Sequence, residues 1–150
     1  MRPRMVAVLV MVAVVGWPAA AVAQDWREVD NPYQEDVVYD LGETFNPRVD
    51  VEGVRWQSLR IEVPDGAPAD AEEDVAVEVT VEVENRTPSA ERVLIILLLE
   101  DGDGGPLDRI ELREFKIGSE RRKERRTTAR LSGEHLRAAE RLYLFFEVLE

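Results

Sequence analysis

The chain has 150 residues, of which 31 are acidic and 19 basic, so its formal net charge is −12. It contains no cysteine, which excludes disulfides, thiolate nucleophiles, thiolate metal sites and the lipidated cysteine of a bacterial lipoprotein. The acidic balance repels nucleic-acid backbones, so we expect no nucleic-acid partner, and the length predicts one domain with one core.

The N-terminus has the pattern of a secretory signal peptide. Two arginines precede an apolar run over residues 5–15, and Ala21 and Ala23 are the small residues that a signal peptidase reads. We therefore predict a signal peptide at residues 1–23 and a secreted or periplasmic protein with no stable membrane insertion after cleavage. The alternative is an uncleaved helix that anchors the domain to the outer face of the cytoplasmic membrane, because the apolar stretch is just long enough to span a bilayer.

Residues 24–47 are polar and carry several turn signals, which predicts an N-terminal arm ahead of the folded domain. Only residues 37–41 indicate a short strand. The aromatic side chains of the arm leave two alternatives: an exposed adhesive surface, or one or two rings packed on a sheet with the others free. These aromatic residues are Trp26, Tyr33, Tyr39 and Phe45.

The rest of the chain has the periodicity of β-strands. Valines alternate with mainly polar residues over 75–83, which predicts a strand with one buried and one wet face. Residues 93–99 are apolar at every position, which predicts a central strand covered on both faces. Within residues 107–117 the apolar set changes parity, which predicts a β-bulge near Arg113 and Glu114.

About seven short strands, separated mainly by tight turns, predict an all-β fold over residues 48–150. Its expected form is an immunoglobulin-like antiparallel β-sandwich. One or two helical turns are expected within residues 132–140, before a last strand at 141–150. The pattern leaves the order of the strands open.

Part of this domain resembles the FxLYD-type bacterial extracellular domains. Leu97, Leu99, Asp101 and Gly104 occupy the places of the F, L, D and later G of that signature, with leucine and glutamate replacing its two aromatic residues. The valine-rich strand and residues 115–118 are also similar, and the resemblance covers about residues 75–149. It implies an exported β-sandwich that serves as a binding or structural accessory, and it carries over no catalytic residue.

Catalytic and metal motifs are weak in this sequence, so we predict no catalytic residue, no metal site and no cofactor. Asp101 and Asp103 lie in a glycine-rich turn, but calcium spacing would require a glycine at Pro106 and a glutamate at Leu112. A plain hairpin turn is the better interpretation. His135 is the only imidazole and lies in a polar segment, where we expect it to be solvated.

A basic run stands out in this acidic chain, and it is the candidate binding site. The run consists of Arg121, Arg122, Lys123, Arg125 and Arg126. In an extended strand Lys123 and Arg125 share one face while Arg122 and Arg126 share the other, so no face gathers all the charge. One interpretation is a charged edge strand that prevents edge-to-edge aggregation, and the other is a contact for lipid head groups or an acidic partner. The valine-rich strand offers glutamates as cross-strand partners: Glu78, Glu82 and Glu84.

Two classes of function follow from the sequence. The first is an exported non-catalytic module that binds an unknown protein or envelope polymer. The second is a hydrolase of the cell envelope that uses a pair of carboxylates. A chain with 31 acidic residues places some pair at any separation, so such a pair by itself carries no information. A pocket between convergent acids would favour the enzyme, and a flat sheet face or an exposed edge would favour the binding module.

Overall fold

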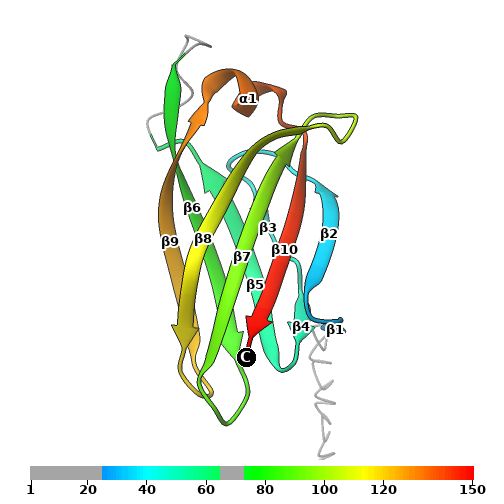
Figure 1. Ribbon diagram of the computed structural model, residues 1–150, viewed down its shortest axis with the longest axis vertical. Helices are drawn as coiled ribbons and strands as arrows, with labels where there is room; N and C mark the ends of the chain where they lie inside the picture. The colour runs from blue at the N-terminus through cyan, green and yellow to red at the C-terminus, as the bar shows by residue number, and fades with distance from the viewer. Residues whose placement is uncertain (1–24, 65–72) are drawn as a thin grey trace, which may run out of the picture.

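The computed structural model describes residues 25–64 and 73–150, which form a two-layer β-sandwich with one short helix at one end (Figure 1). The elements in chain order are β1 (Arg27–Glu28), β2 (Tyr33–Val38), β3 (Thr44–Phe45), β4 (Val49–Val51), β5 (Val54–Glu62), β6 (Asp74–Asn85), β7 (Glu91–Glu100), β8 (Pro106–Ile117), β9 (Arg122–Ser132), α1 (Gly133–Ala138) and β10 (Arg141–Leu149). The all-β sandwich predicted from the sequence is confirmed. The predicted signal peptide lies outside the described residues.

The strands form two sheets that pack face to face. Sheet A has the order β1-β4-β5-β6-β9, with β3 paired to β5, and sheet B has the order β2-β10-β7-β8. The strand pairs are antiparallel except for β1 and β4, which run parallel. The turns between β6 and β7 and between β8 and β9 lie at the end of the sandwich opposite α1 (Figure 1).

The core lies between the sheets, and strand alternation builds it. The valines of β6 at positions 75, 77, 79, 81 and 83 are 0 to 6% exposed, which confirms the predicted buried face. The inner residues of β10 are also buried, and the ring of Phe146 lies 5.5 Å from the ring of Trp56 on sheet A. Each strand therefore contributes every second side chain to one shared apolar layer.

β7 is a central strand, as predicted, because it pairs with β10 on one side and with β8 on the other. The prediction that both of its faces are covered is only half right. Ile95 and Leu97 are fully buried in the core, whereas Leu94, Ile96 and Leu98 point outward and keep part of their surface exposed. The continuous apolar run therefore marks one core face and one apolar outer face.

Part of the predicted N-terminal arm belongs to the sandwich. β2 pairs with β10 along its whole length, and Tyr33 and Tyr39 are 5% and 7% exposed. The sequence gives a weak strand signal here because β2 is an edge strand whose other positions are mostly polar. Its inward Glu35 accepts hydrogen bonds from the Tyr33 hydroxyl and from Arg27. Residues 33–38 are thus structural, which corrects the boundary expected at residue 48.

Three local predictions are confirmed. β8 shifts register against β7 between Phe115 and Leu112, which leaves Arg113 and Glu114 both exposed in a bulge. α1 covers residues 133–138, and the last strand follows it.

In the part of the chain that the structure describes, no helix is long and apolar enough to cross a membrane.

Candidate functional site

The predicted basic site lies on β9, at the edge of sheet A, where the strand pairs with β6 alone. Arg121 stands in the turn before the strand. Arg122 and Arg126 point outward, while Lys123 and Arg125 point toward the space between the sheets and are half-buried. The basic side chains therefore divide between the two faces of the strand, as expected from their spacing.

The outward arginines of β9 make cross-strand ion pairs. Arg122 lies 3.0 Å from Glu82, and Arg126 lies 3.9 Å from Glu78 and 2.8 Å from Glu124 on its own strand. Two of the three predicted glutamate partners are thus observed. The third, Glu84, instead accepts a hydrogen bond from the Gln57 amide at 2.9 Å.

The inward cations of β9 cover the open edge of the core. The Lys123 ammonium donates to the Lys116 carbonyl at 2.8 Å and lies 5.8 Å from the centre of the Phe115 ring. The Arg125 guanidinium lies 5.9 Å from the same ring. Inward charges on an edge strand oppose pairing with another strand, so this geometry suits the edge-guarding interpretation of the basic run. Binding of an anionic partner stays a prediction.

A second surface was not singled out in the sequence. The outer side of sheet B carries an apolar face, formed by outward side chains of β7 and β10: Leu94, Ile96, Leu98, Tyr143 and Phe145. Leu98 pairs in register with Tyr143, and Ile96 with Phe145, so these side chains are direct neighbours across the two strands. Val38, at 71% exposed, lies at the β2 side of this face. The unbroken apolar run at 93–99 was the signal that could have located the surface.

Charged side chains surround the apolar face of sheet B, and several of them form ion pairs with one another. Arg109 lies 3.0 Å from Glu111, Arg92 lies 2.7 Å from Glu114, and Arg141 lies 2.9 Å from Asp36. Exposed pairs of this kind contribute little to stability. They do balance the local charge, so this face is close to neutral in a strongly acidic protein.

Glu100 is the one acidic side chain of the described residues that is buried. It follows the last apolar residue of β7 and is 9% exposed, with Oε2 lacking a hydrogen-bond partner among the described residues. Burial raises the pKa of the Glu100 carboxyl, and the nearby Asp36 carboxylate raises it further, while Arg141 opposes the shift. Glu100 and Asp36 are therefore the acid pair to weigh as a catalytic dyad.

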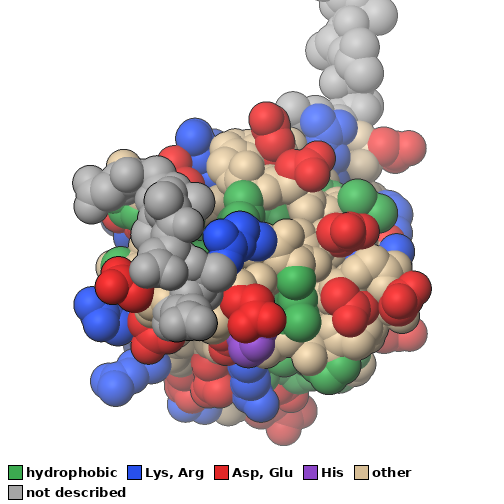
Figure 2. All heavy atoms as spheres, turned by 90° about the horizontal axis from the view of Figure 1, so that it is seen from above, with side chains coloured by type: hydrophobic (Ala, Val, Ile, Leu, Met, Phe, Trp, Pro, Cys, Tyr) green, Lys and Arg blue, Asp and Glu red, His purple; other side chains and the backbone are tan. Residues whose placement is uncertain are grey.

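The remaining candidates have structural roles. Asp101 Oδ1 accepts backbone hydrogen bonds from Asp103 and Gly105, and Gly104 has a φ of 82°, so this segment is a hairpin turn as predicted. Asn85 is fully buried, and its amide donates to three backbone carbonyls. His135 lies at the α1 end, 3.4 Å from Asp108. Figure 2 shows this end from above, where acidic and basic side chains intermix over the described surface.

Comparisons with known proteins give little to transfer. No family model matches the sequence, and no curated protein matches it significantly. A solved structure with a similar arrangement is the RGD-containing host-selective toxin Ptr ToxA of Pyrenophora tritici-repentis. It is 11% identical, the match covers 84% of this chain and 98% of that one, and the TM-score is 0.37. The resemblance to FxLYD-type domains stays a prediction.

Proposed function

We propose that this chain is an exported, non-catalytic binding module that docks another protein through the apolar face of sheet B. The observation that carries the proposal is the row of half-buried leucine, isoleucine, tyrosine and phenylalanine side chains on the outer side of β7 and β10. Monomeric proteins keep contiguous exposed apolar surface small, and the largest patch of this kind often marks a contact surface. Aromatic side chains are also enriched where proteins meet.

The charge of the molecule favours a different protein over a second copy as the partner. Two copies of a chain with a net charge of −12 repel one another at low salt. Three of the cations around the apolar face, Arg92, Arg109 and Arg141, are already paired with acids and so offset little of that repulsion. An apolar patch on a neutral or basic protein meets neither obstacle.

The alternative function, a hydrolase that uses carboxylates, has Glu100 and Asp36 as its best pair. A general acid needs a raised pKa, which Glu100 has, and it must also reach the substrate. Glu100 is 9% exposed, so little of its side chain is open to a polymer substrate. This burial favours a binding module over an enzyme.

Site-specific photo-crosslinking in producing cells tests the proposal. The crosslinking residue p-benzoylphenylalanine replaces Ile96 on the apolar face of sheet B or Ala76 on the outer side of sheet A. Both positions face outward on central strands, and Ala76 lines none of the described clefts, so it is a suitable control. We expect one protein to be trapped from position 96, not from position 76, and to be lost when Phe145→Ser is added.

Two results would contradict this proposal. Equal trapping from both positions would mean that the contact is not specific to sheet B. A product at position 96 with the mass of two copies of this chain would mean that the apolar face binds a second copy of the chain and not another protein. Export is checked in the same cells by intact mass, where we expect a chain that begins at Gln24; retention of all 150 residues in membranes would favour the anchored form.

A further inference from the structure

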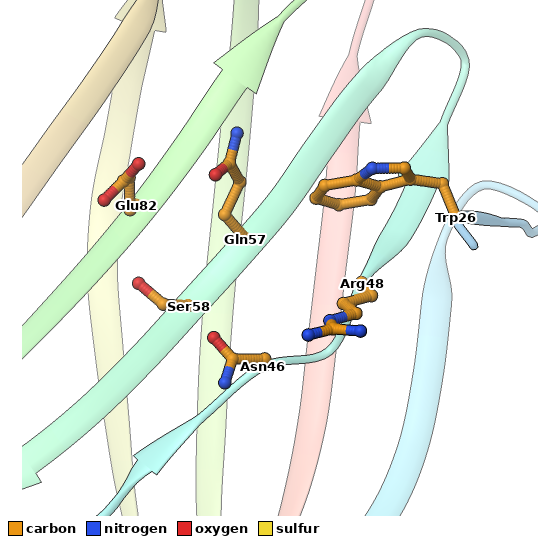
Figure 3. Close-up of a pocket in the computed structure, with 6 residues that line it drawn as sticks. All are labelled: Trp26, Asn46, Arg48, Gln57, Ser58 and Glu82. Carbon is orange, nitrogen blue, oxygen red and sulfur yellow. The ribbon is translucent and has the colours of Figure 1, made fainter. Parts of the chain in front are cut away.

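The outer side of sheet A holds a polar cleft of about 170 Å³ that the proposed protein contact does not use. Six side chains from separate parts of the chain line it: Trp26, Asn46, Arg48, Gln57, Ser58 and Glu82. Figure 3 shows Trp26 and Arg48 at one end and Glu82 at the other, with the smaller polar groups between them. The cleft therefore combines an aromatic ring with amides, a hydroxyl, a guanidinium and a carboxylate.

A β-bulge in β5 creates the floor of this cleft. Trp56 pairs with Val83 and Ser58 with Glu82, so Gln57 is an extra residue in the strand. Regular alternation would send one of Gln57 and Ser58 into the core, but the bulge turns both outward while Trp56 and Leu59 stay buried. Bulges of this kind commonly re-aim side chains at binding sites.

Two further features hold the cleft in shape. Arg48 has a positive φ of 52°, a backbone conformation that non-glycine residues adopt only at some cost, and it lies on the cleft wall. The Arg55 guanidinium lies 4.7 Å from the centre of the Trp26 ring and is itself held by Asp50 at 3.0 Å. One face of the indole is therefore braced, and the ring is fixed at the mouth of the cleft.

Several polar groups in the cleft are free to bind a ligand. Gln57 donates to Glu84, and Glu82 pairs with Arg122. The side chains of Asn46, Arg48 and Ser58 make no hydrogen bond or ion pair with another described residue, although all three line the same small space. Donors and acceptors are thus gathered with no protein partner among the described residues.

A second cleft of about 200 Å³ continues from the first across sheet A. It is lined by Thr44, Ser58, Arg60, Glu62, Glu78, Thr80 and Arg126, so Ser58 belongs to both clefts. Each is smaller than the roughly 300–1,000 Å³ of a site for a whole small molecule. Two small clefts joined through one residue fit successive units of a polymer better than a single compact ligand.

We propose that this polar groove, the two clefts joined at Ser58, binds a neutral β-1,4-linked carbohydrate chain. Sugar rings present a C–H face that packs on an aromatic ring such as Trp26, and their hydroxyls pair with amides, carboxylates and guanidinium groups. The second cleft is balanced between two arginines and two glutamates, and the whole protein repels anions. A neutral chain is therefore favoured over an anionic one, and the equatorial β-1,4 linkage gives an extended chain that can place successive sugar units in the two clefts.

Titration calorimetry of the protein purified from cells expressing the full chain tests this site, with chitohexaose and cellohexaose as probes. We expect one or both to bind, with little change between 0.05 and 0.5 M salt because the ligand carries no charge. Trp26→Ala removes the aromatic ring, and Ser58→Gln fills the junction of the two clefts. Each should weaken binding at least tenfold without lowering the melting temperature by more than a few degrees.

Thr128→Gln is the matched control, because Thr128 faces outward on the same sheet and lines neither cleft. It should bind like the parent protein. The proposal is overturned if neither hexasaccharide binds at millimolar concentration, if Thr128→Gln weakens binding as much as Trp26→Ala, or if an anionic hexamer of galacturonic acid binds more tightly than both. None of these results bears on the protein contact at sheet B.

Discussion

The two outer sides of the sandwich are built by the same strand alternation, yet they expose different chemistry. On sheet A the outward positions of β6 are mainly acidic, with one alanine and one threonine, and β9 adds arginines that pair with two of the glutamates. On sheet B the outward positions of β7 and β10 include leucine, isoleucine and aromatic side chains. The shared inner layer explains the fold, so the difference between the outer sides is the place to look for function.

The largest effect is expected when a charge is placed on the buried face of β6 and not on its outward face. Val79→Asp places an unpaired charge among fully buried side chains of β6, which costs as much as the roughly 5–15 kcal/mol that stabilise a small domain. Glu78→Lys changes the outward residue next to Val79 and removes one long ion pair, the pair with Arg126. Thermal melts should show an unfolded first variant and a nearly unchanged second one. Equal damage would mean that the assigned faces of β6 are wrong.

A smaller effect is expected on β7, where the inward Ile95 and the outward Ile96 are both apolar. Ile95→Thr buries a hydroxyl in the core and should cost about 2–4 kcal/mol. Ile96→Thr acts on the half-exposed apolar face of sheet B and should cost about 1 kcal/mol. Urea unfolding measures both, and similar costs would show that the outer side of sheet B is covered like the core.

At the edge of sheet A, we expect association to depend on whether charged side chains are present and not on the sign of their charge. Replacing Arg122, Arg125 and Arg126 by valine or threonine should cause concentration-dependent association, measured by sedimentation velocity. Replacing the same three residues by glutamate should leave the association state of the parent protein unchanged. The melting temperature should fall by a few degrees, because two ion pairs to β6 become like-charge contacts.

If the basic run instead binds an anionic partner, the glutamate variant behaves differently. Binding of the parent protein to phosphatidylserine vesicles would then be measurable, would weaken above about 0.15 M salt, and would be lost in the variant. We expect no such binding by vesicle sedimentation. Its presence would make the run on β9 a functional site rather than a guarded edge.

The smallest effect concerns the buried acid at the end of β7. The folded state raises the pKa of Glu100, so the fold favours its protonated form, and its contribution to stability is lost as pH rises through that pKa. Glu100→Gln should therefore raise the melting temperature by a few degrees at pH 8 and not at pH 4. Glu111→Gln, at an exposed position on sheet B, should show no such gain. A gain that is the same at both pH values would mean that charge burial at Glu100 is not the cause.

Features with a strong local period were predictable from the sequence. The valines of β6, the bulge at Arg113 and Glu114, and the inner set of β10 follow from which neighbours alternate, because a strand turns successive side chains to opposite sides. The same signal existed for the bulge in β5, where the apolar set moves from Val54 and Trp56 to Leu59 and Ile61. That change of parity was not used, so the cleft above it was missed.

Features that depend on distant segments were not predictable. β2 reads as a polar arm because its only deeply buried side chain is Tyr33, and its pairing with β10 joins residues more than 100 positions apart. The partners of the basic run were predicted in part. Glu78 and Glu82 pair with β9, but Glu84 is taken by Gln57, a residue turned outward by the bulge.

The sequence by itself determined the all-β class, the inner face of the main strands and the acidic character of the protein, because period, turn residues and charge are local properties. The tertiary structure decided which strands lie at the edges, that the described residues cover the outer side of β7 only in part, and that Trp26, Asn46 and Ser58 meet in one groove. Those outcomes depend on contacts between segments far apart in the chain. Such contacts form only when the two sheets close on a common core.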